Sequence, residues 1–144
     1  MYVAHHATAH ASGARIVHAC GFDSIPHDLG AQFTVEHLPE GVPLTVEGFV
    51  RAGEGPSEEQ RRKGWFSVRF AGRAGDGPRV VTEVSGGDPG YGETAKMLGE
   101  SALCLAHDDL PPTAGQVTPA AAMGPALRDR LQRAGIGFSV LERS

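Results

Sequence analysis

The 144-residue sequence predicts an α+β protein in which an antiparallel sheet carries helices on one face. Two observations lead to this fold class. The first is that three segments with strand periodicity follow one another from Leu44 onward. The second is that two helical segments and a last strand come after them. An order of strands first and helices afterwards is typical of an α+β layer. The first 40 residues carry a different pattern, which is a helix, a short apolar strand and a second helix.

The amino-terminal segment predicts a helix followed by a strand. Residues 2–12 are rich in alanine and histidine, and Gly13 suits the position that ends a helix. Residues 15–20 form a near-continuous apolar run, as in a parallel strand covered on both faces. Only about a dozen residues precede this strand, fewer than the two βαβ units that an open parallel sheet needs. We therefore expect that the chain starts in the middle of a domain.

A second helix is expected after this strand. Pro26 suits the first turn of a helix, where its missing N–H group costs nothing. The helix runs to about Leu38, and Leu29 and Phe33 lie four residues apart on one of its faces.

The strands of the antiparallel sheet are predicted from alternation of apolar and polar residues. Residues 44–52, 65–71 and 79–85 each alternate in this way. Residues 72–78 form a turn rich in glycine and aspartate, so the second and third strands are expected to make a hairpin. Residues 54–63 are polar and charged, which is typical of a surface connection or a frayed helical turn.

Two helices and one strand complete the predicted layer. Residues 91–106 give the strongest helical pattern, with a single apolar stripe at spacings of four and three. The stripe consists of Tyr91, Ala95, Leu98, Ala102 and Leu105. Thr118 is an N-cap followed by proline, and the helix that it starts runs to Ala134. Gly135 ends that helix, and residues 136–141 form the last strand.

Composition excludes several classes of function. The net charge is -4, so the chain lacks the basic footprint of a nucleic-acid-binding protein. No apolar run is long enough to span a bilayer, and the start has no signal-peptide pattern. Cys20 and Cys104 do not make a disulfide framework, so we expect two free, buried thiols and a cytoplasmic protein.

The segment GGDPGYGETAK, residues 86–96, is the first candidate site. It follows a strand and opens a helix, so free N–H groups at the helix start would suit an anionic or carbonyl ligand. Its glycines fit the looser dinucleotide fingerprint, but no strand ending in an acid follows about 20 residues later. From spacing alone, a ligand site and a plain glycine-rich turn remain equally good interpretations.

The loop of residues 21–28 is the second candidate site. A hydroxyl and a carboxylate, from Ser24 and Asp23, follow a strand at the sheet edge where open α/β sheets bind ligands. These groups could orient a substrate or a nicotinamide amide. A plain helix start, with Ser24 as N-cap and Asp28 as first-turn acid, explains the same residues.

A metal site is not expected. His6 and His10 share a helix face, and His18 and Cys20 share a strand face. No zinc-type spacing supports either pair, so solvated histidines are the preferred interpretation.

Both candidate segments resemble one known family. The stretch SGARIVHACGFDSIPHDLG is similar to the end of the Rossmann domain in saccharopine dehydrogenase-like oxidoreductases, and in particular in mycobacterial trans-acting enoyl reductases. The stretches GWFSVRFAG, RVVTEVSGGDPGYGETAKMLGESALCLA and AGQVTPAAAMGPALRDRLQRAGIGFSVLE are similar as well. The resemblance covers nearly the whole chain, and its long glycine-containing block is specific.

The resemblance implies two units and a cofactor. Residues 1–40 would be the carboxyl-terminal remnant of a dinucleotide-binding Rossmann domain, and residues 41–144 would be an α+β substrate or cap domain of the saccharopine reductase type. NADP or NAD is the implied cofactor. Its nicotinamide would lie beside five residues of the first motif: Cys20, Gly21, Phe22, Asp23 and Ser24.

The second motif would face the same cleft from the other side. Tyr91 and Lys96 are the implied catalytic residues, for substrate polarisation or proton delivery, and Asp88 and Thr94 the implied substrate-binding residues. The implied reaction is hydride transfer to a conjugated double bond in a lipid or polyketide precursor. A lipid-type small molecule is thus the expected partner, with a homodimer and peripheral membrane association as further options.

The sequence departs from the family in two places. The amino-terminal glycine fingerprint is absent, and a second segment is missing between Arg51 and Glu54. The chain therefore resembles a family member that is truncated at its start and shortened in its middle, and we expect it to be inactive alone. Without the pyrophosphate-binding turn, independent cofactor binding is in doubt. The alternative function is a non-catalytic α+β interaction or dimerisation module built from the antiparallel sheet.

Overall fold

The chain folds around two sheets of different kinds. A computed structural model describes residues 2–53, 59 and 63–144. The larger sheet is antiparallel, in the order β2-β3-β4-β6, with β2 at Leu44–Gly53, β3 at Trp65–Ala74, β4 at Arg79–Gly86 and β6 at Gly137–Arg143. The smaller sheet pairs β1 (Arg15–Val17) with β5 (Gly115–Val117) in parallel. The expected α+β class and antiparallel sheet are confirmed.

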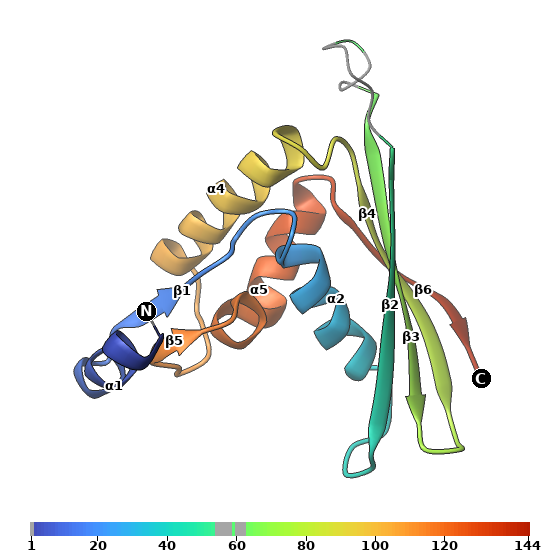
Figure 1. Cartoon of the computed structure of the whole chain (residues 1–144), viewed down its shortest axis with the longest axis horizontal. Helices are drawn as coiled ribbons and strands as arrows, with labels where there is room; N and C mark the ends of the chain where they lie inside the picture. Colours follow the sequence, from blue (N-terminus) through green and yellow to red (C-terminus); the bar gives the residue numbers. More distant parts are fainter. Residues whose placement is uncertain (1, 54–58, 60–62) are drawn as a thin grey trace.

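Helices cover one face of the larger sheet and leave the other open (Figure 1). The described helices are α1 (Tyr2–Ser12), α2 (Ile25–Val35), α4 (Gly92–His107) and α5 (Pro119–Arg133), of which α1 packs on β5 of the smaller sheet. α2 packs directly on the sheet, and α4 packs on α5. In the described part of the chain, no helix combines the length and the apolar character needed to cross a bilayer.

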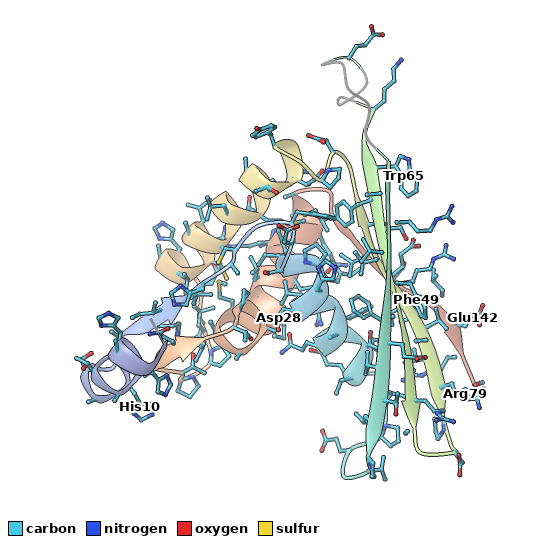
Figure 2. All side chains as sticks on the ribbon, viewed as in Figure 1. His10, Asp28, Phe49, Trp65, Arg79 and Glu142 are labelled. Carbon is cyan, nitrogen blue, oxygen red and sulfur yellow. The ribbon has the colours of Figure 1, made fainter. Side chains whose placement is uncertain are left out.

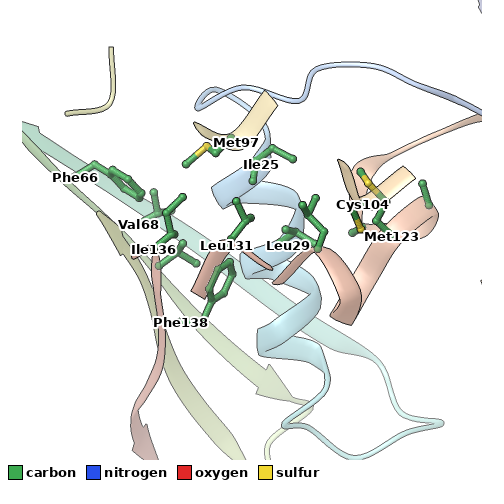
Figure 3. Close-up of a cluster of buried hydrophobic side chains, with 14 of the residues drawn as sticks. Ile25, Leu29, Phe66, Val68, Met97, Cys104, Met123, Leu131, Ile136 and Phe138 are labelled. Atoms are coloured by element: carbon green, nitrogen blue, oxygen red, sulfur yellow. The ribbon is translucent and has the colours of Figure 1, made fainter. Parts of the chain in front are cut away.

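The core lies between the covered face of the sheet and α2 and α5. Strand alternation places Phe66, Val68 and Phe70 of β3 on the inner face, and each of them is buried. Leu29 of α2 and Leu131 of α5 complete the same cluster, with no exposed surface (Figure 3). Burying one such side chain fully contributes about 1.5–3 kcal/mol, so this cluster dominates the stability of the fold.

A glycine allows α2 to lie close to the sheet. A Cβ atom added at Gly30 would stand 2.3 Å from Cε2 of Phe70 and 2.9 Å from Cγ2 of Val84. One turn further along, the buried hydroxyls of Thr34 and Thr82 make a 2.7 Å hydrogen bond between α2 and β4. Contact at this distance fixes the helix on the sheet.

Several element boundaries differ from the sequence prediction. The strand expected over residues 15–20 ends at Val17, because Ala19 has a left-handed backbone with φ 57°. The hairpin turn is tighter than residues 72–78, since β3 continues to Ala74 and the chain reverses around Gly75. The expected connection over residues 54–63 lies largely outside the described residues.

The prediction also missed a strand and the orientation of a helix. β5 has only three residues, too few for a periodic pattern, and it is defined by pairing with β1. In α4 the buried side chains are Glu93, Met97, Ser101 and Cys104. The predicted apolar stripe instead faces outward, with Leu98 58% exposed.

Helix α5 contains a break. Gly124 has φ 44° and ψ -125°, outside the helical region, and Pro125 follows it. The helix thus consists of two pieces at an angle. The first piece follows β5, and the second carries the buried Leu127 and Leu131 toward β6.

Candidate functional site

The loop between β1 and α2 forms the centre of the candidate site. Its backbone turns sharply at Ala19 and then closes on the helix, with the Ser24 and Ile25 amides donating to Gly21 O at 3.2 and 2.9 Å. A left-handed conformation costs an alanine about 1–2 kcal/mol. Backbone strain of this kind clusters at functional sites, which makes this loop a candidate for one.

The two candidate segments of the sequence are in contact. The backbone amide of Phe22 donates to Oγ1 of Thr94 at 3.3 Å, and that hydroxyl donates to Pro89 O at 3.1 Å. A Cβ at Gly21 would lie 3.2 Å from Cγ2 of Thr94. The loop after β1 therefore packs against the first turn of α4, although they are about 70 positions apart.

A pocket of about 870 Å³ opens on the other side of this loop. It lies at the carboxyl ends of the parallel strands β1 and β5, the edge at which parallel sheets bind ligands. Asp23 and Ser24 from the first motif line it, and their role in ligand binding stays a prediction. The pocket is also lined by His18, Ala19, His27, Asp28, Gln116, Val117, Thr118, Pro119 and Ala121.

The helix N-termini beside this pocket are capped from within the protein. Asp28 Oδ2 accepts a 2.7 Å hydrogen bond from the Ala120 amide, and Thr118 Oγ1 accepts one of 3.3 Å from Ala121. At α2 the Asp28 amide donates to Ser24 O at 2.8 Å. These amides are therefore not available to bind the pyrophosphate of a dinucleotide, which usually takes such groups.

The structure divides the first motif between two environments. Asp23 and Ser24 face the pocket, whereas Gly21 and Phe22 contact α4 and the sheet. The Phe22 ring packs edge-on against Phe66, with centroids 4.9 Å apart. Cys20 is half-buried, and burial raises the pKa of its thiol, an effect that a hydrogen bond with Ser101 partly offsets.

The residues predicted from the second motif lie at the start of α4 and outside the pocket lining. Tyr91 is 83% exposed. Lys96 Nζ donates to Oε1 of the buried Glu93 at 2.9 Å. Asp88 accepts from the Gly90 and Gly92 amides at 3.2 and 3.1 Å, so its carboxylate organises the turn that starts the helix. Their catalytic and substrate-binding roles stay predictions.

The sequence did not identify several residues that line the pocket. His18 and Gln116 join the ends of β1 and β5 through a 3.0 Å contact between Nε2 and Oε1. His27 Nδ1 is buried and has no hydrogen-bond partner within the described residues. The strand β5 is too short to show the alternation of apolar and polar residues. The sequence pattern therefore could not identify Gln116 as a residue of the pocket.

The amino-terminal histidines are not arranged as a metal site. His6 Nδ1 accepts from the Gln116 amide at 3.1 Å, and its ring centroid lies 6.1 Å from that of His10. Among the residues that the structure describes, no group of three or more metal-ligating side chains occurs. The hydrogen bond between the His6 side chain and the Gln116 backbone thus connects α1 to β5.

A second depression, of about 660 Å³, lies on the open face of the larger sheet. Figure 2 shows Arg79 and Glu142 on this side, with Trp65 nearer the other end of the strands. Arginine and glutamate side chains are mixed here, with Glu47 and Arg73 also lining the depression. Charges of both signs give no preference for a charged ligand, so the pocket at β1 and β5 remains the candidate site.

The known proteins that are similar to this chain include proteins named as enoyl reductases and as an oxidoreductase. A Mycobacterium tuberculosis protein named as a trans-acting enoyl reductase is 39% identical over 104 residues, which is 70% of this chain and 24% of that protein. A trans-acting enoyl reductase from Mycobacterium ulcerans is 38% identical over 91 residues, or 62% of this chain and 22% of its own length. A saccharopine dehydrogenase-like oxidoreductase from Bos taurus is 35% identical over 101 residues, covering 61% and 24%.

The chain therefore spans about a quarter of the length of the curated relatives it matches. No protein-family profile matches the sequence. No solved structure matches it either.

Proposed function

The chain belongs to the family that includes the trans-acting enoyl reductases, and we propose that it forms the nicotinamide-end portion of an NAD(P)-dependent oxidoreductase. The observation that supports this best is the pocket lined by Asp23 and Ser24 at the carboxyl ends of β1 and β5. The implied reaction is reduction of the conjugated double bond of an enoyl substrate derived from a lipid or polyketide precursor.

The residues present fit one end of the cofactor. The pocket volume of about 870 Å³ is large enough for a planar ring, and the carboxylate of Asp23 and the hydroxyl of Ser24 in its lining could accept and donate hydrogen bonds to a carboxamide. The capped helix starts leave no cradle for the pyrophosphate among the described residues. A bound nicotinamide would supply the hydride, and the protein would orient the ring and shield it from water.

Proton delivery is assigned to the start of α4. Reduction of an enoyl group needs a proton at one carbon after hydride reaches the other, and a tyrosine hydroxyl or a lysine ammonium can donate it. Tyr91 and Lys96 flank Thr94, which contacts the loop after β1. Replacing the matched tyrosine and lysine in a longer relative tests the assignment, and unchanged turnover in both variants would reject it.

Binding of the cofactor by this chain can be measured directly. We expect NADPH to bind weakly, with a dissociation constant on the order of 1 mM, because only its nicotinamide end is held. Reduced nicotinamide mononucleotide should then bind within about threefold of NADPH, since the adenine half adds little. Nicotinamide fluorescence and ligand-observed NMR report both titrations.

A pair of variants locates the site. Asp23→Ala should weaken binding of both ligands by about tenfold, because the carboxamide of the ligand then lacks the carboxylate that accepts its hydrogen bond. Glu142→Ala, on the open face of the sheet, is the control and should leave the titrations unchanged. No binding of either ligand at several millimolar would reject the proposal.

A non-catalytic role is the second candidate. The face of the larger sheet opposite the helices is uncovered, with Phe49 57% exposed upon it. An open sheet face of this kind suits an interaction or dimerisation module. Failure to bind NADPH, together with dimerisation that Phe49→Glu abolishes, would favour this function over the oxidoreductase.

A further inference from the structure

Helix α4 has its polar and apolar sides reversed relative to an ordinary surface helix. Its charged side chains point inward, and Glu93 is only 7% exposed. Its exposed positions over Gly92–His107 include no aspartate, glutamate, lysine or arginine, and the exposed His107 stands at its carboxyl end. We define the outer face of α4 by Ala95, Leu98, Ala102, Leu103 and Leu105, all of them exposed. An ordinary helix at a protein surface places such residues against the core.

The inward charges are held by specific partners, so the orientation of the helix is fixed. Lys96 and Glu93 pair with each other at 2.8 Å. Glu100 accepts from Arg130 of α5 at 3.3 Å, and Arg130 also donates to Asp108 at 2.8 Å. Rotating α4 to bury its leucines would break the contacts of Arg130 with Glu100 and Asp108, so the outer face stays exposed in the folded chain.

We propose that the outer face of α4 is the contact surface between two copies of this chain. Ala95, Leu98, Ala102 and Leu105 are spaced three, four and three residues apart, which is the seam pattern of two packed helices. Alanine alternates with leucine along this seam, so the leucines of one copy can fill the spaces over the alanines of the other. A two-fold axis pairs this surface with itself.

Charge favours a second copy over the other occupants. The seam from Ala95 to Leu105 presents no aspartate, glutamate, lysine or arginine to a charged partner, and pairing it with itself brings no like charges together. A lipid surface would favour lysine and arginine along the rim of the helix. Lys96 and Arg130, which lie beside α4, are instead paired with Glu93 and with Asp108 and Glu100, and the exposed basic residue of the helix is His107 at its end.

The length of the helix sets the strength of the contact. Sixteen residues of helix extend about 24 Å, and one such seam is smaller than the roughly 800 Å² per partner of a standard interface. We therefore expect a reversible dimer with a dissociation constant on the order of 10–100 µM.

Sedimentation velocity over a range from about 1 to 500 µM tests the proposal. The wild-type chain should shift from monomer to dimer across this range. Leu98→Glu should raise the dissociation constant at least tenfold, because it places two like charges at the seam. Phe49→Glu is the matched control, since Phe49 is 57% exposed and lies on the sheet, and it should leave the dimer intact. Circular dichroism of both variants checks that they fold.

A cross-link gives an independent readout. Leu98→Cys should form a disulfide-linked dimer under mild oxidation, whereas Phe49→Cys should not. The native thiols interfere little, because burial raises the pKa of Cys20 and raises that of Cys104 to about 12.

The proposal fails if the wild-type chain stays monomeric at 500 µM, or if Phe49→Glu rather than Leu98→Glu dissociates the dimer. It also fails if the monomer binds vesicles containing about 30% anionic lipid through Leu98. None of these results depends on cofactor binding, so the proposed function and this contact surface stand or fall separately.

Discussion

At the scale of single residues, the strained backbone at Ala19 is the clearest local sign of a site. Ala19 adopts φ 57° between β1 and the loop of the first motif, and it also lines the pocket. The strain persists because β1 and the start of α2 fix both ends of the loop. A conformation that costs free energy here shapes the wall of the pocket.

Replacing Ala19 by glycine should stabilise the fold. Glycine adopts a left-handed backbone without the steric cost, so we expect Ala19→Gly to raise the free energy of unfolding by about 0.5–1 kcal/mol. Ala102→Gly is the opposite control, in the middle of α4, and should lower it by about 1 kcal/mol. Urea denaturation measures both. A loss of stability in Ala19→Gly as large as that in Ala102→Gly would show that the alanine is not strained.

The candidate site could be predicted from the sequence only in part, and the reason is local. Asp23 and Ser24 follow an apolar strand, and that pattern correctly placed them at a sheet edge. Gln116 could not be found in this way, because its position depends on a three-residue pairing about 100 residues distant. Pairing over such a separation leaves no periodic trace in the sequence.

At the scale of elements, hydrophobic spacing located helices correctly but did not determine which side packs. The stripe through Leu98 identified α4, yet Met97 and Cys104, one position before Leu98 and before Leu105, are the buried residues. The inner side is decided by Arg130 of α5, which binds Glu100 and Asp108. Charge pairing between helices has no signature in the spacing of one helix.

Asp28 connects two elements and gives a test at this scale. Its carboxylate on α2 caps the start of α5 through the Ala120 amide, as Figure 2 places it between these helices. Asp28→Ala should therefore lower the free energy of unfolding by about 1 kcal/mol, as loss of an N-cap does. Asp28→Asn keeps an oxygen acceptor and should retain most of that stability.

The control for this test is Asp129→Ala on the exposed side of α5, which we expect to change stability by less than about 0.5 kcal/mol. Thermal and urea denaturation at neutral pH compare the three variants. Equal stability of Asp28→Ala and wild type would show that the Ala120 amide finds another acceptor.

At the scale of the whole molecule, the two predicted units interlock. β1, from residues 1–40, pairs with β5, from residues 41–144, and α2 packs on the larger sheet. The boundary near residue 40 stays a prediction, because the sequence resemblance and not the packing suggested it. Strand alternation in the sequence predicted the α+β class. The connection between the two sheets could not be predicted in this way, because it depends on the short strand β5.

The two sheets should differ in local stability. β1 and β5 share three residue pairs and, within the described residues, have no further strand beside them, while β3 is hydrogen-bonded on both sides along its length. We expect the amides of β1 and β5 to exchange with deuterium at least about tenfold faster than those of Val68 and Phe70. Hydrogen exchange read by NMR or mass spectrometry measures this difference. Equal protection in both sheets would mean that the chain opens only as one unit.

The contact of Gly30 with Phe70 has a consequence for how this chain can change over generations. Gly30 and Gly99 both lie inside helices, but a side chain at position 99 would meet nothing within 4 Å. Drift at position 99 is therefore nearly free, and alanine there is favoured by helix propensity. At position 30 every accessible single-base change adds atoms where an aromatic ring already stands, so a lineage that keeps this fold keeps that glycine.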